Sequence, residues 1–124
     1  MKLDGEENES TLRAANNYAV SLRDLQHFEE AKILLRKTMP VARRVLGESH
    51  NFTLRMRMVY GAALYKDTGA TLDDLREAVT TLEETVRIAR RVLGHAHPTV
   101  DLVESHLRHS RAALRARETP SPGS

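Results

Sequence analysis

The chain has 124 residues, 40% hydrophobic and 29% charged, with a formal net charge of +2. It has no cysteine, which excludes a disulfide framework and a thiolate metal site. The first residues are acidic rather than signal-like, and no apolar run approaches the ~20 residues that span a bilayer, so we expect one soluble, cytoplasmic domain.

Apolar residues recur at steps of three and four, and glycine or polar clusters separate the runs, so we predict an all-α fold. Residues 1–9 are expected to be a flexible acidic segment and residues 117–124 a disordered tail, because neither offers an apolar face to bury. The predicted helices span residues 10–25, 28–46, 52–66, 72–93 and 98–116.

Local signals define the ends of these helices. Pro40 falls inside the second helix, but the apolar period continues through it, which predicts one helix with a kink near residues 36–40. Gly47 and Gly94 stand where a helix ends in a residue of positive φ. Thr71 or Asp73 is expected to cap the fourth helix.

The chain contains an internal repeat. Residues 28–47 align with residues 75–94 at ten identical positions in twenty, and the segment before each of them repeats at a shift of 42. The first of these matches has a shift of 47 residues and the second a shift of 42, and an insertion around residues 68–71 explains the difference. We therefore predict two units, residues 10–50 and 51–97, followed by a capping helix over residues 98–116. Tyr18 and Tyr60 are equivalent in this repeat, and we expect the same packing for both.

Several motifs carry a family resemblance. Asn16-Asn17-Tyr18-Ala19 with Leu22, Phe28-Glu29-Glu30-Ala31, and the two Val-Leu-Gly junctions at residues 45–47 and 92–94 resemble the tetratricopeptide repeats, in the 42-residue form of kinesin light chains. The resemblance implies antiparallel helix hairpins stacked into an α-α superhelix.

The resemblance also assigns small residues to the close helix crossings. These positions fall on Ala19 and Gly61. The second unit departs from the pattern, since Met58-Val59 replaces the asparagine pair. The last helix has Arg108 at the position of the small residue, so we expect it to cap the array rather than begin a third full repeat.

The resemblance further implies a peptide-binding concave face lined by the first helix of each unit. Arginine and lysine on this face would favour a partner with acidic groups. The alternative is that these residues are only the solvated sides of amphipathic helices. Carried over by position, the face consists of Arg13, Asn16, Asn17, Val20, Arg23, Asp24, Arg55, Met58, Ala62, Tyr65 and Lys66.

We therefore expect a non-enzymatic protein-protein interaction module with no cofactor. No glycine-rich phosphate loop is present, and His106 and His109 lack the further ligands that a metal site would need. Two alternatives remain open. The chain could self-associate as part of a longer array, because two repeats fall below the usual minimum of about three. It could also bind nucleic acid through the last helix, with Arg108, Arg111, Arg115 and Arg117, although the near-neutral charge makes this the weaker reading.

Overall fold

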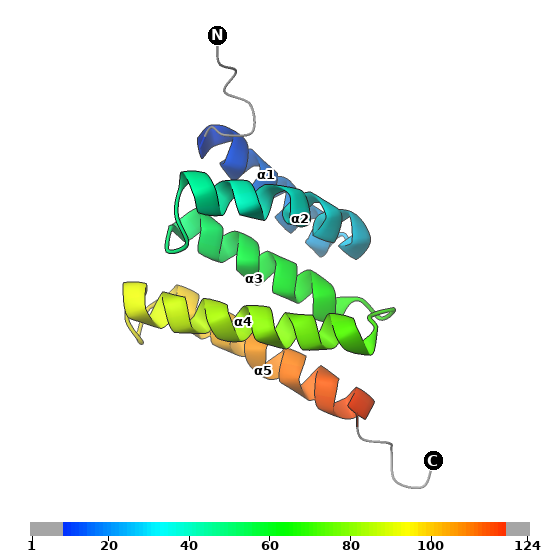
Figure 1. Ribbon diagram of the computed structural model, residues 1–124. Coiled ribbons are helices and arrows are strands. Elements are labelled where there is room, and N and C mark those ends of the chain that lie inside the picture. Colours follow the sequence, from blue (N-terminus) through cyan, green and yellow to red (C-terminus); the bar gives the residue numbers. More distant parts are fainter. Residues whose placement is uncertain (1–8, 119–124) are drawn as a thin grey trace, which may run out of the picture.

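The computed structural model describes residues 9–118, and this segment folds into five α-helices (Figure 1). The predicted all-α helix-hairpin fold is confirmed. Of the two segments expected to be flexible, residues 1–8 and 119–124 lie outside the described segment, whereas Glu9 belongs to the first helix and Arg117 and Glu118 to the last. The helices are α1 (Glu9–Asp24), α2 (Phe28–Val45), α3 (Asn51–Lys66), α4 (Leu72–Leu93) and α5 (Pro98–Glu118).

The helices stack in chain order from one end of the molecule to the other (Figure 1). Consecutive helices pack together, and α3 also contacts α1 and α5. The helices α1, α3 and α5 are therefore neighbours along one side of the stack. Among the described residues, the backbones of α2 and α4 are not in close contact.

The helix α3 lies at the centre of the core. Every residue from 53 to 64 is buried except Arg55. The largest apolar cluster joins Leu12 of α1, Leu35 of α2 and Met56 of α3. A second cluster joins Leu82 of α4 and Val103 of α5 to α3. Because α3 is covered on nearly all sides, its one exposed residue in this stretch faces the open side.

Gly61 allows α3 and α4 to approach closely. A Cβ atom at this position would lie 2.7 Å from Leu82 Cγ, and Leu82 is fully buried. The equivalent Ala19 of α1 is also fully buried. The two small residues predicted at the helix crossings therefore do allow tight packing.

The helix ends follow the predicted signals. Thr71 caps α4, since its side chain accepts from the Asp74 backbone N–H and the Asp74 side chain accepts from the Thr71 N–H in return. Gly47 and Gly94 have φ values of 98° and 88°. The helix α2 runs through Pro40 as a single helix, as expected, while the kink stays a prediction.

The prediction of equivalent packing for Tyr18 and Tyr60 is wrong. Tyr60 is only 4% exposed because α2 and α4 flank it, and its hydroxyl accepts from Arg36 Nε at 3.0 Å and donates to Glu77 Oε2 at 2.6 Å. Tyr18 is 58% exposed. It lies on α1 at the end of the stack, where no further helix of the described segment covers it.

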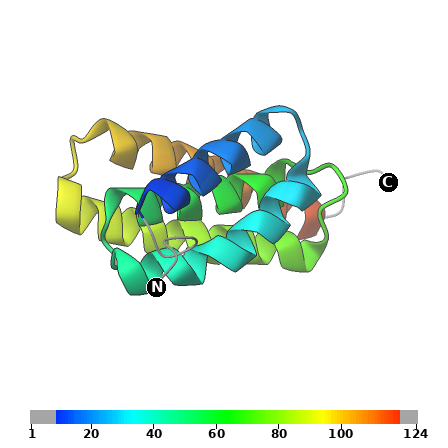
Figure 2. The same cartoon turned by 90° about the horizontal axis from the view of Figure 1, so that it is seen from above.

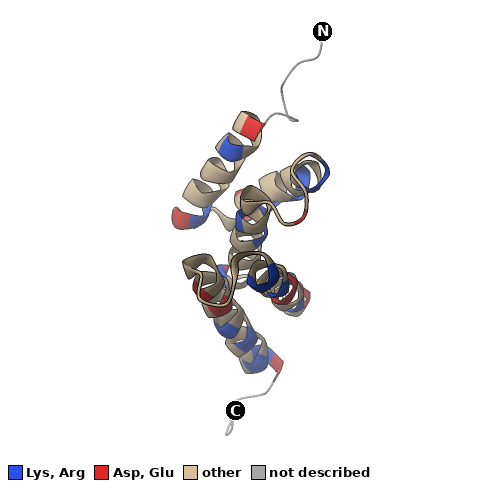
Figure 3. Ribbon diagram, turned by 90° about the vertical axis from the view of Figure 1, so that its left-hand side faces the viewer, with Lys and Arg blue, Asp and Glu red and all other residues tan. Residues whose placement is uncertain are grey.

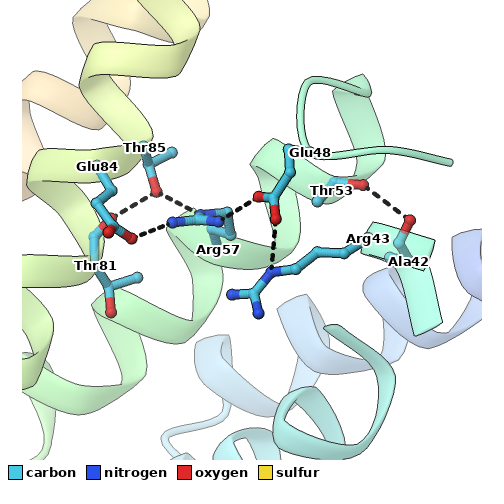
Figure 4. A network of polar contacts seen from close by, with 8 residues as sticks. All are labelled: Ala42, Arg43, Glu48, Thr53, Arg57, Thr81, Glu84 and Thr85. Carbon is cyan, nitrogen blue, oxygen red and sulfur yellow. Dashed lines mark hydrogen bonds and ion pairs between the residues drawn. The ribbon is translucent and has the colours of Figure 1, made fainter. Parts of the chain in front are cut away.

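A buried arginine joins the two hairpins on the side of α3 that faces α4 (Figure 4). Arg57 is 4% exposed, and its guanidinium donates to Thr85 Oγ1 at 3.2 Å, Glu84 Oε1 at 2.6 Å and Glu48 Oε1 at 3.0 Å. Glu48 in turn contacts Arg43 of α2. This network connects α2, α3, α4 and the loop after α2.

Candidate peptide-binding groove

A groove of about 560 Å³ runs along the side formed by α1, α3 and α5. Each of these helices presents residues at successive turns, because residues three or four apart share a helix face. The lining residues are Asn16, Asn17, Val20 and Arg23 of α1, Arg55, Met58, Val59 and Lys66 of α3, and Thr99, Leu102 and His106 of α5.

Most of the predicted binding residues meet in this groove. Asn16, Asn17, Val20, Arg23, Arg55, Met58 and Lys66 line it, and Tyr65 lines an adjoining hollow that shares Lys66.

Three predicted residues lie elsewhere. Ala62 is fully buried and offers no surface to a ligand. The Arg13 guanidinium lies over the Phe52 ring, 5.6 Å from the ring centroid. Asp24 pairs with Arg23 at 3.1 Å beside the groove.

The groove is positively charged. Arg23, Arg55 and Lys66 line it, and no aspartate or glutamate is among its lining residues. Arg23, which also pairs with Asp24, and Lys66 both lie near His106, whereas Arg55 lies near the start of α3, so the cations occupy two places along the groove. The arrangement suits an extended ligand with several acidic groups.

Next to the groove, Asn16 carries a buried acceptor that is unpaired within the described segment. Its side chain is 4% exposed, and its Oδ1 has no hydrogen-bond partner among the described residues. Leaving such an atom unpaired is costly, but because the oxygen is buried a ligand can reach it only if the Asn16 side chain turns outward. The exposed Asn17 beside it carries both a donor and an acceptor.

The helix α5 contributes residues that the sequence prediction missed. Its predicted role was only to cap the array, but Thr99, Leu102 and His106 face the groove. Leu102 is 50% exposed there. A signal was present: at the shift of 47 residues, Arg55 and Val59 align with Leu102 and His106.

His106 and Tyr65 are both uncharged at neutral pH. Burial lowers the pKa of His106 to about 4, with smaller contributions from the nearby Lys66 and Arg23. Burial likewise raises the pKa of Tyr65 to about 12. The positive charge of the groove therefore comes from its arginines and lysine.

Two other histidines serve the helix junctions. His50 caps α3, its Nδ1 accepting from the Phe52 N–H at 3.1 Å, and His97 Nδ1 accepts from the Thr99 N–H at 3.1 Å. No three His, Asp or Glu side chains within residues 9–118 are grouped as metal ligands.

The arginines of α5 are partly engaged within the molecule. Figure 3 shows several Lys and Arg positions along the C-terminal part of this helix. Arg111 pairs with Glu83 of α4 at 2.9 Å, and Arg117 donates to the Ala70 carbonyl at 2.6 Å. These contacts reduce the cationic surface available to a polynucleotide. Over the described helices, none has the length and apolarity needed to cross a bilayer.

These features define a helical repeat array with a polar groove on one side. The family model described as tetratricopeptide repeat matches residues 11–51 and 70–99, which together are more than half of the chain. The chain therefore belongs to the tetratricopeptide repeat family, whose members generally mediate protein-protein interactions and are generally non-enzymatic. No curated protein and no solved structure matches the chain. The unmatched interval contains most of α3, where Met58 and Val59 replace the asparagine pair.

Proposed function

We propose that this protein binds an extended, acidic peptide segment of a partner protein in the groove between α1, α3 and α5, without catalysis. The observation that carries this proposal is the charge of the groove, which has Arg23, Arg55 and Lys66 among its lining residues and no carboxylate. Carboxylates of a bound peptide would form charge-assisted hydrogen bonds with these cations.

The asparagines supply a second type of contact. The exposed Asn17 can bond both the donor and the acceptor of one peptide unit, and the amide of Asn16 beside it can add a further bond if its side chain turns outward. Main-chain bonds of this kind give affinity, while the exposed Leu102 offers an apolar position for one side chain of the ligand. The resemblance of the repeat spacing to kinesin light chains also favours a peptide ligand.

Selection of peptides by the intact protein tests the proposal. A display library of random dodecapeptides is enriched on the wild-type protein, and the enriched peptides are measured by fluorescence polarisation. We expect the enriched peptides to be acidic. Arg55→Glu should weaken the binding of these peptides by at least about tenfold, or about 1.4 kcal/mol. A higher salt concentration should also lower the affinity for these peptides.

Arg108→Glu is the matched control, because it makes the same charge change at an exposed position of α5 that does not line the groove. Enrichment of neutral or basic peptides would contradict the proposal. An equal loss of peptide affinity in Arg55→Glu and Arg108→Glu would contradict it too.

A further inference from the structure

The α1–α2 end of the stack presents apolar surface that no other described helix covers. Figure 2 looks onto this end. Tyr18 of α1 and Ile33 of α2 are 58% and 59% exposed. Two hollows of about 200 and 310 Å³ adjoin here and share Leu34 and Lys37. We call this surface the end face; its residues are Thr11, Ala15, Tyr18, Glu30, Ile33, Leu34, Lys37 and Val41.

The opposite end of the stack has a different character. There α4 and α5 are joined by ion pairs, between Glu83 and Arg111 and between Arg90 and Glu104. The hollow between the two helices is lined mainly by charged residues. The two ends are therefore unlike, and the end face is the more apolar of them.

The end face repeats part of a contact found inside the molecule. In the interior, the Tyr60 hydroxyl lies between Glu77 of its own unit and Arg36 of the preceding unit. The repeat places Tyr18 at the position of Tyr60 and Glu30 at that of Glu77, and both line the same hollow of the end face.

No described helix brings a cation to this pair from the position that Arg36 occupies inside. Glu30 Oε1 contacts only the exposed His27, at 2.7 Å, and its second oxygen forms no hydrogen bond within residues 9–118. The end face thus has the tyrosine and the carboxylate of the interior contact, but its own Lys37 forms no ion pair with Glu30 and no cation of the described segment occupies the position of Arg36.

A second copy of the chain can supply that cation. Glu30, Ile33, Leu34 and Lys37 are spaced by three, four and seven residues, so they share one side of α2. If a second α2 runs antiparallel, with a two-fold axis between Ile33 and Leu34, Lys37 of the second copy lies opposite Glu30 of the first. The symmetry forms the same pair again at the other end of the contact.

We propose that the chain forms a two-fold symmetric homodimer through the end face, with Lys37 of each copy against Glu30 of the other. Two helices about 10 Å wide and about 25 Å long offer about 500 Å² per copy. A total near 1,000 Å² is the lower limit for a specific interface, so the dimer is reversible. Asn17 and Tyr18 line different hollows, so the dimer leaves the groove open.

Sedimentation velocity of the full chain over a concentration series tests this proposal. We expect the wild type to shift reversibly from 14.0 kDa to twice that mass as concentration rises. Glu30→Lys and Lys37→Glu should each weaken the dimer by at least about tenfold. The variant carrying both changes should recover the dimer, because it restores opposite charges across the axis. Ile33→Glu should abolish it.

Val92→Glu is the control, since Val92 is 45% exposed on α4 and lies outside the end face. Circular dichroism melting confirms that each variant is folded. A wild type that stays monomeric at all concentrations would overturn the proposal, as would assembly beyond a dimer. Failure of a folded double variant to recover would overturn it too. Peptide binding is measured separately on the same samples. Failure of the dimer proposal can therefore be told apart from failure of the proposed peptide binding.

Discussion

The Tyr65 hydroxyl and His106 Nδ1 lie 2.7 Å apart and form a hydrogen bond that joins α3 to α5. Their rings meet edge to face, with centroids 5.9 Å apart. Burial keeps both side chains uncharged at neutral pH. The pair therefore holds the position of α5 against α3, and with it the width of the groove.

The first prediction concerns stability as the pH falls. The pKa of His106 is about 4 in the folded protein and near 6.5 when the chain is unfolded. Above pH 6.5 the residue is neutral in both states. Between pH 6.5 and 4 only the unfolded chain takes up the proton, so the free energy of unfolding decreases as pH falls through this window.

Chemical denaturation of the wild type and of His106→Gln between pH 7.5 and 4 measures this effect. Between pH 7.5 and pH 5, the free energy of unfolding of the wild type should fall by about 1 kcal/mol more than that of the variant, after allowance for solvent screening. Parallel curves for the two proteins would show that His106 is not the group responsible.

The second prediction concerns the close contact of α3 and α4. Gly61→Ala places a Cβ 2.7 Å from Leu82 Cγ in a fully buried site, so we expect a loss of about 1–3 kcal/mol in unfolding free energy. Gly69→Ala is the control, because its nearest atom would be 3.4 Å away. In a Leu82→Ala background the cost of Gly61→Ala should disappear. An unchanged cost in that background would contradict the steric explanation.

The third prediction concerns the buried arginine between the hairpins. Arg57→Lys keeps the charge but cannot donate to Thr85, Glu84 and Glu48 at once, so unfolding free energy should fall by about 1–2 kcal/mol. The same change at the exposed Arg55, two residues earlier, should have an effect within about 0.5 kcal/mol. Equal effects at both positions would argue against a structural role for Arg57.

The fourth prediction compares two arginines that are equivalent in the repeat. Arg55 lines the groove, whereas Arg13 lies over the Phe52 ring. Arg55→Ala should therefore lower the affinity for an acidic peptide by at least about threefold and leave the stability of the fold unchanged. Arg13→Ala should leave the peptide affinity unchanged. Fluorescence polarisation measures the affinities and thermal melting the stabilities. A larger affinity loss for Arg13→Ala would place the ligand elsewhere.

The helices and most of the groove could be predicted from the sequence because their signals are local or repeated. The apolar period and the cap residues place all five helices to within two residues of their observed ends. The asparagines and Arg55 face the groove because helical spacing determines which residues share a side.

Other features depend on distant partners and could not be predicted. Arg57 has an ordinary surface residue type, and its burial results from Glu84 and Thr85, far along the chain. Tyr18 and Tyr60 have the same sequence context but different neighbours in space, so the repeat alone did not show which one is covered. Ala62 was expected on the open side, but contacts from several helices enclose this part of α3.

The ion pair between Glu83 and Arg111 limits how copies of this chain can combine. In the repeat, Glu83 occupies the position of Arg36, the residue that donates to the Tyr60 hydroxyl of the following unit. The helix α5 packs against α4 at the place that α1 of a copy stacked head to tail would have to take, so Glu83 meets Arg111 there instead of Tyr18 and Glu30 of another copy. While α5 stays in this place, a second copy cannot continue the stack in the register of the internal repeat.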